Sequence, residues 1–240
     1  MEIEGRRVLI TGANRGLGRA LALAFLGAGA REVLAGFRQP ESLKDLREAA
    51  QDARLTPVRL DITSEDDVRA AADLGRVDIL INNAGICTFG SVLRAEMAEL
   101  HQELDVNYFG ALRMARAIAP KMTAQGDGLI VNVASILAKV SLPAMGNYCA
   151  LKAALLSLSQ ALRGELGKYG VRVITVMPGT IDTDMSRDFS GPKMSSQQAA
   201  LEIVEAIRVE GIETPIGDAA REVLAGLASD PLAIEKSFAA

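Results

Sequence analysis

The feature that most constrains this chain is a repeated alternation of short apolar runs with longer amphipathic stretches. The apolar runs, interpreted as strands, cover residues 7–11, 32–36, 57–60, 78–82, 129–133, 171–176 and 214–216. The amphipathic stretches, interpreted as helices, cover residues 15–28, 41–53, 64–74, 95–124, 147–169, 196–209 and, last, 218–228. Strands that are apolar throughout are buried on both faces. The pattern therefore predicts a doubly wound α/β fold, in which a parallel sheet of about seven strands carries helices on both faces.

Composition excludes several classes of function. The 240 residues include 26 Lys and Arg against 30 Asp and Glu, and no linker or repeat divides them, so we expect one domain over residues 1–240. The acidic balance, the 4% of aromatic residues and the absence of Trp argue against a nucleic-acid partner. One histidine and two distant cysteines argue against a bound metal. Without an apolar run of about 20 residues or a secretory signal, we expect a soluble, cytoplasmic protein with no membrane partner.

A glycine-rich turn joins the first expected strand to the first expected helix. Its sequence is TGANRGLG, at residues 11–18. The free backbone N–H groups and the dipole of a helix N-terminus attract phosphate, and glycines let the backbone approach it closely. The placement between strand and helix predicts a nucleotide site on a Rossmann-like fold. The alternative is an ordinary tight turn.

The residues after the second strand indicate which dinucleotide would bind. Folds that use NAD place an acid about 20 residues after the glycine turn, where it holds the ribose 2′-hydroxyl. Here Phe37 and Arg38 end the strand, and no acid follows before Glu41. Arg38, together with Arg15 in the turn, suits a 2′-phosphate. The sequence therefore favours NADP(H) over NAD(H), unless the two arginines are solvated surface charges.

A tyrosine and a lysine open the long helix at 147–169. Tyr148 and Lys152 are four residues apart and lie on one helix face. An ammonium group lowers the pKa of a nearby phenol from its usual value near 10, which makes tyrosine usable as a proton donor and acceptor. Ser135 follows the buried run 129–133, at the strand end where ligands bind in parallel sheets. An ordinary surface pair of Tyr and Lys is the alternative.

These motifs together resemble the short-chain dehydrogenase/reductase family, over nearly the whole chain. Residues 11–18 are similar to its TGxxxGxG turn, 82–85 to its NNAG segment, 105–107 to the segment with its active-site Asn, 148–152 to its YxxxK motif, and Pro178, Gly179, Ile181 and Thr183 to the segment that wraps the nicotinamide. Ser135 matches its catalytic serine.

The resemblance implies a catalytic role for Asn107, Ser135, Tyr148 and Lys152. Tyr148 would exchange a proton with the substrate oxygen, which Ser135 would hydrogen-bond. Lys152 would bind the nicotinamide ribose and lower the pKa of Tyr148, and Asn107 would hold a water that links Lys152 to a proton relay. The expected cofactor contacts are Gly12, Asn14, Arg15, Gly16, Leu17, Gly18, Arg38, Asp61, Ile62, Asn83, Ala84, Gly85, Tyr148, Lys152, Pro178, Gly179, Ile181 and Thr183.

The expected activity is an NADPH-dependent oxidoreductase that transfers a hydride between the nicotinamide and a small carbonyl compound or secondary alcohol. A 3-oxoacyl-thioester reductase and a sugar or steroid dehydrogenase are alternatives within the family. A nucleotide-binding sensor without chemistry is an alternative of another class. A sensor has no need for the four catalytic residues together.

Three further expectations concern the surroundings of the site. The polar segment 184–197, with Met185 and Phe189, is long for a connection between elements and is a candidate substrate lid. The helices at 95–124 and 147–169 carry more apolar residues than one sheet face needs, which favours a homodimer or homotetramer. We expect His101 at the surface or a subunit interface, and Cys87 and Cys149 as small buried fillers.

Overall fold

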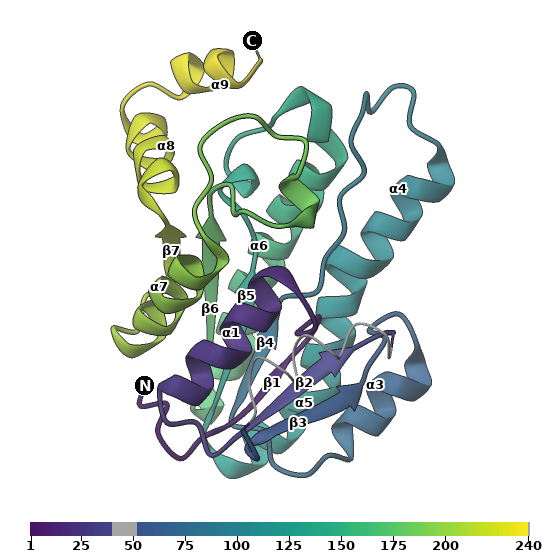
Figure 1. The fold of residues 1–240 in the computed structure, drawn as a ribbon, viewed down its shortest axis with the longest axis vertical. Helices are drawn as coiled ribbons and strands as arrows, with labels where there is room; N and C mark the ends of the chain where they lie inside the picture. The colour runs from purple at the N-terminus through teal and green to yellow at the C-terminus, as the bar shows by residue number, and fades with distance from the viewer. Residues whose placement is uncertain (40–51, 240) are drawn as a thin grey trace.

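In the computed structural model, which describes residues 1–39 and 52–239, the described strands form one parallel sheet (Figure 1). The strands are β1 (Arg7–Ile10), β2 (Glu32–Phe37), β3 (Leu55–Arg59), β4 (Ile79–Asn82), β5 (Gly128–Val133), β6 (Val171–Pro178) and β7 (Glu213–Ile216). Their order is β3-β2-β1-β4-β5-β6-β7. The direction of winding reverses between β1 and β4, and open α/β sheets bind ligands at the carboxyl ends of the strands at such a point.

Helices cover both faces of the sheet, as predicted (Figure 1). They are α1 (Gly16–Gly27), α3 (Glu65–Ala72), α4 (Met97–Leu104), α5 (Ala111–Gln125), α6 (Gly146–Leu166), α7 (Ser196–Arg208), α8 (Asp218–Ser229) and α9 (Pro231–Ala239). One hydrophobic core contains Phe25 of α1 and Ile203 of α7, and a second contains Val68 of α3, Met114 of α5 and Leu166 of α6. The Rossmann-like architecture expected from the sequence is therefore correct.

The helix expected over residues 95–124 differs from the prediction. Between α4 and α5 the chain makes a wider π-helix over Asp105–Gly110. Gly110 in this segment packs so closely against the Ile62 side chain that a Cβ at this position would collide with it. A π-helical turn changes the direction of the side chains that follow it and often marks a functional site. Here it contains Asn107.

Other boundaries also differ from the prediction. The strand expected at 57–60 begins at Leu55 and includes Pro57, which is tolerated because β3 pairs only with β2 at the sheet edge. The long helix α6 ends at Leu166 and continues as a 3-10 turn. The expectation that the helix at 218–228 is the last is wrong, because α9 follows. The helix expected at 41–53 lies, apart from residues 52 and 53, outside the described residues; these two precede β3 without helix.

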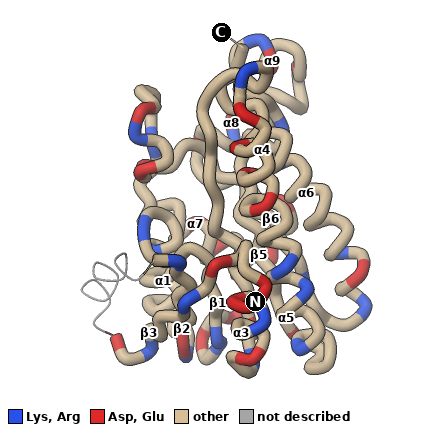
Figure 2. The backbone as a smooth tube through the Cα atoms, turned by 90° about the vertical axis from the view of Figure 1, so that its right-hand side faces the viewer, with Lys and Arg blue, Asp and Glu red and all other residues tan. Residues whose placement is uncertain are grey.

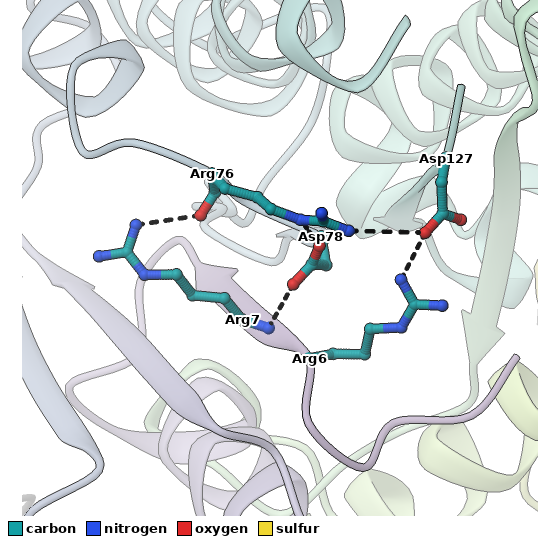
Figure 3. A network of polar contacts seen from close by, with 5 residues as sticks. All are labelled: Arg6, Arg7, Arg76, Asp78 and Asp127. Carbon is teal, nitrogen blue, oxygen red and sulfur yellow. Dashed lines mark hydrogen bonds and ion pairs between the residues drawn. The ribbon is translucent and has the colours of Figure 1, made fainter. Parts of the chain in front are cut away.

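The starts of the central strands are tied by a polar network (Figure 3). Asp78, buried just before β4, accepts a hydrogen bond from the backbone N–H of Arg7 at 2.8 Å and pairs with Arg76. Asp127, just before β5, pairs with Arg6 and, at 3.8 Å, with Arg76. The network joins β1, β4 and β5 at the edge opposite the strand ends where a ligand would bind.

The rest of the described surface mixes the two signs of charge. Lys and Arg positions are interspersed with Asp and Glu positions along the chain (Figure 2). Within the described residues, no helix combines the length and the apolar character that a bilayer crossing requires.

Candidate active site

The glycine-rich turn lies against the end of β4. Thr11 Oγ1 accepts hydrogen bonds from the backbone N–H groups of Asn83 and Ala84, both at 3.0 Å. Asn83 Nδ2 donates to the carbonyl oxygens of Thr11 at 2.9 Å and Gly12 at 3.2 Å. Gly12 has a φ of +64°, and a Cβ there would lie 3.0 Å from Ala84 Cα. The turn therefore requires glycine at residue 12 for both its conformation and its close contact.

The start of α1 fits a bound phosphate. Arg15 precedes the helix without making a side-chain cap hydrogen bond, and the first turn carries no acidic residue. Gly16 has a φ of +52°, and a Cβ on it would lie 3.2 Å from Thr183 Cγ2. At Gly18, a Cβ would collide with the Gly12 carbonyl oxygen. A glycine-lined turn that leads to an uncapped helix N-terminus is an anion-binding arrangement.

Three of the expected catalytic residues converge on the loop after β4. Asn107 is buried, and its Nδ2 donates to the Ile86 carbonyl oxygen at 2.8 Å while its Oδ1 accepts from the Ile86 N–H at 3.2 Å. A Cβ on Gly85 would lie 2.7 Å from Asn107 Oδ1 and 3.7 Å from Lys152 Nζ. Lys152 Nζ is 5.3 Å from the centre of the Tyr148 ring. Gly85 therefore lies close to both Asn107 and Lys152, and a side chain on it would collide with Asn107.

Strand ends position the remaining groups. Lys152 Nζ donates to the Val133 carbonyl oxygen, at the end of β5, at 2.9 Å. Ser135 follows β5, and its hydroxyl donates to the Pro178 carbonyl oxygen at the end of β6 at 3.4 Å. It also accepts from the Leu137 N–H at 3.1 Å and so caps a short 3-10 turn that packs against α6. Ser135, Tyr148 and Lys152 therefore belong to one site at the carboxyl edge of the sheet.

Burial controls the protonation of the site. It raises the pKa of Tyr148 above its ordinary value, and the nearby Cys87, Cys149 and Glu103 add to this rise. Burial also lowers the pKa of Lys152 to about 8. The pKa of Tyr148 is therefore raised in this structure, whereas a lowered pKa was expected, and burial is the largest cause of the rise. Tyr148 is held as the neutral phenol, which is a proton donor.

The residues expected to select the cofactor are placed differently from one another. Arg38 is exposed directly after β2. Arg15 is exposed as well, and its Nη1 lies 3.1 Å from Asp184 Oδ2. Asp61 Oδ1 accepts from the N–H of Thr63 at 2.9 Å, and Ile62 is buried. Both arginines are thus solvent-exposed. They lie after the carboxyl ends of β1 and β2, on the side of the sheet where the ribose of a dinucleotide would lie.

The segment after β6 folds back on itself. Gly179 N–H donates to the Ile216 carbonyl oxygen at 3.1 Å. Ile181 forms an isolated parallel bridge with Met194. Thr183 caps the 3-10 turn Asp184–Ser186. The Ile181–Met194 bridge therefore joins the two ends of the segment that was expected to be a lid, 184–197. The last two residues of this segment are the first two of α7.

One buried acid near the site is not among the residues expected from the sequence. Glu103 has no exposed surface, and it accepts hydrogen bonds from the Thr88 N–H and from Asn147 Nδ2. Its position four residues before Asn107, within the helix expected over residues 95–124, is a signal that could have found it. His101 is exposed, Cys149 is buried and Cys87 is half-buried.

Comparisons of sequence and structure find known proteins that are similar to this chain. The sequence profile described as short chain dehydrogenase matches residues 6–193. A short chain dehydrogenase from Burkholderia cenocepacia, solved in complex with NADP, has a TM-score of 0.92 and 42% identity, with 99% of each chain covered.

Curated relatives are similar over most of this chain. D-erythrulose reductase from Gallus gallus is 36% identical over 82% of this chain and 80% of its own length. Dehydrogenase/reductase SDR family member 7B from Xenopus tropicalis is 38% identical over 75% of this chain, which spans 62% of that relative's length.

Proposed function

Because the chain belongs to the short-chain dehydrogenase/reductase family of oxidoreductases, we propose that it is an NADPH-dependent reductase of a small carbonyl compound, or a dehydrogenase of the corresponding secondary alcohol. The observation that carries the proposal is the convergence of Asn107, Ser135, Tyr148 and Lys152 on one edge of the sheet, beside the glycine turn. A protein that only senses a nucleotide needs the turn but not these four groups.

The residues of the site fit a dinucleotide. Gly12, Gly16 and Gly18 leave the space in which a side chain would otherwise stand, and the uncapped start of α1 offers its N–H groups to the pyrophosphate. Arg15 and Arg38 would hold the 2′-phosphate of NADP, and the similar Burkholderia protein was solved with NADP. When bound, the nicotinamide supplies or accepts the hydride.

Each of the four polar residues has a separate task in this proposal. Tyr148, held as a phenol, gives its proton to the substrate oxygen, and Ser135 donates a hydrogen bond to the same oxygen. Lys152, fixed by the Val133 carbonyl oxygen, orients the ribose. Asn107 fixes the loop after β4 through Ile86 and holds a water for the proton relay.

The test is turnover of a substrate panel with each cofactor. Purified protein is given NADPH or NADH with small ketones, aldehydes and 3-oxoacyl thioesters, and the loss of reduced cofactor is followed. Tyr148→Phe removes the proton donor, so kcat should fall by roughly 10²–10⁴-fold while the Kd for NADPH changes little. Lys152→Ala should raise that Kd and lower kcat together. A Tyr148→Phe variant with the turnover of the wild type would contradict the assignment.

A further inference from the structure

A fully buried carboxylate lies outside the group of residues described as catalytic. Glu103 in α4 has 0% of its surface exposed. Glutamate is almost never fully buried unless it is paired, because burial of an unpaired carboxylate is strongly unfavourable. An apolar side chain would fill the same space at lower cost. What Glu103 binds is therefore the useful guide to its role.

Both oxygens of Glu103 are used. Oε1 accepts from the backbone N–H of Thr88, and Oε2 accepts from Nδ2 of Asn147. These donors come from different parts of the fold, since Thr88 is in the loop after β4 and Asn147 is in the first turn of α6. Hydrogen bonds to an ionised acceptor are among the stronger ones in proteins. One carboxylate thus connects the loop to the helix.

The two connected elements border the reaction centre. Asn147 directly precedes Tyr148. Thr88 lies two residues after Ile86, which Asn107 holds from the next turn of the same helical segment. Thr88 and Asn147 also line a hollow of about 200 Å³, together with Phe89, Val92 and Leu100. The Glu103 link therefore connects two residues that line this hollow, Thr88 and Asn147, and Asn147 is next to Tyr148 in the chain.

We propose that Glu103 is a positioning residue that fixes the loop at 86–96 against the start of α6 and thereby shapes the substrate space beside Tyr148. The proposal rests on the proposed function for what that space binds. In this proposal Glu103 determines the affinity for the substrate, and it does not need to contact the cofactor.

The first experiment compares Glu103→Gln with Glu205→Gln. The amide has the size of the carboxylate, but it turns an N–H group toward one of the two donors, so one hydrogen bond is lost. We expect KM for the carbonyl substrate to rise about tenfold or more, with an unchanged Kd for NADPH. Amide hydrogen exchange of residues 86–96 should become faster. Glu205, exposed on α7 and not part of the lining of the hollow, should give wild-type values for all three when changed to Gln.

The second experiment exchanges the donor and acceptor. In the double variant Glu103→Gln with Asn147→Asp, the Gln oxygen accepts from Thr88 and the Gln amide donates to Asp, so both hydrogen bonds return. We expect its KM to return to within about threefold of the wild type. Asn147→Ala breaks the same link from the α6 side, should raise KM in the same way, and takes the place of Glu103→Gln if that variant does not fold.

Several results would overturn the proposal: an unchanged KM in the single variants, a lower kcat and Tm at an unchanged KM, or unchanged exchange of the loop. If the wild type binds NADPH but reduces no carbonyl compound, the proposed function fails, and the exchange measurement alone then decides whether Glu103 holds the loop.

Discussion

At the scale of single residues, the protonation of Tyr148 has a consequence for pH dependence. Burial holds its pKa above the ordinary value, so the phenol keeps its proton through the neutral range. Carbonyl reduction uses the protonated form, which is present below the pKa and lost as the pH rises through it. Alcohol oxidation uses the deprotonated form. From about pH 6 to about pH 8, we expect kcat for reduction to stay flat and kcat for oxidation to rise.

Lys152 provides the control for this profile. Its pKa of about 8 means that it loses its charge as the pH rises through that value, close to the range of the measurement. Lys152→Arg carries a permanent charge, so any change in kcat caused by the loss of the Lys152 charge near pH 8 should disappear. The rise of kcat for oxidation that is due to Tyr148 should persist. An oxidation rate that levels off below about pH 7 would assign the proton transfer to another group.

Cofactor preference also depends on single side chains. The wild type should use NADPH better than NADH, by at least about tenfold in kcat/KM, because Arg15 and Arg38 would each make a charge-assisted contact with the 2′-phosphate. Arg38→Asp should remove most of this preference by weakening NADPH. Arg69→Asp, an exposed change of the same kind on α3, should have no effect. Equal use of the two cofactors by the wild type would refute the prediction.

The sequence was sufficient to find the residues whose signal is local. Tyr148 and Lys152 are marked by their spacing, and Ser135 by its place after a buried run. Glu103 was missed because its partners, Thr88 and Asn147, lie 15 and 44 residues away in the sequence. The rise in the Tyr148 pKa differs from the expected direction for a related reason, since its largest cause is burial, which is a property of the folded chain.

At the scale of elements, an ion pair connects the segment after β6 to the glycine turn. Asp184 pairs with Arg15 at 3.1 Å and with Arg187 at 2.8 Å. The same Arg15 is expected to bind the 2′-phosphate, so Asp184 competes for it. We predict that Asp184→Asn lowers the Kd for NADPH by no more than about fivefold, because an exposed ion pair is weak, and leaves the Kd for NADH unchanged.

The matched control for this change is Asp188→Asn in the same exposed segment. Fluorescence titration of reduced cofactor measures both values of Kd. Weaker binding of NADPH by Asp184→Asn would mean that Asp184 holds Arg15 in place for the phosphate and does not compete with it.

Helices and strands were predictable from the sequence where the spacing of apolar residues determines them. Strands and helices of the central fold follow the apolar pattern. The pattern does not distinguish a π-helical turn from an α-helical one, so it predicts ordinary helix over Asp105–Gly110. The wider turn coincides with the tight contact of Gly110 with Ile62, which comes from a distant part of the chain. The expected strand starts at Pro57, whereas β3 starts two residues earlier, at Leu55. An edge strand tolerates a proline within it, so Pro57 does not mark the strand start.

At the scale of the whole molecule, alternation of strands and helices predicts a parallel sheet covered on both faces, and this is the architecture observed. The order of the strands needs more than alternation. Several orders satisfy right-handed crossovers, and the reversal between β1 and β4 selects the one in which the glycine turn and the loop after β4 are neighbours. That neighbourhood brings Thr11 and Asn83 together, and the same loop after β4 reaches Lys152 at Gly85.

The outer face of α6 leads to a prediction about assembly. Ala153, Ser157 and Ala161 are exposed on it at a spacing of four residues, and Phe109 in the neighbouring π-helix is 41% exposed. Small side chains allow two helices to approach closely, and an exposed aromatic ring adds apolar area. A two-fold axis against this face would pair the surface with itself, as an isologous interface requires. We therefore expect a dimer, or a tetramer if a second surface is used.

The prediction is tested by placing a long charged side chain at the centre of that face. Ala153→Arg should convert the assembly to monomers, because a guanidinium cannot be accommodated twice across a two-fold axis without repulsion and loss of close packing. Ala70→Arg on α3 makes the same change on another exposed helix and should leave the mass unchanged. Sedimentation velocity at micromolar protein measures both variants. A wild type that sediments as a monomer would contradict the interface, whereas a wild-type dimer unaffected by Ala153→Arg would move it to another surface of the molecule.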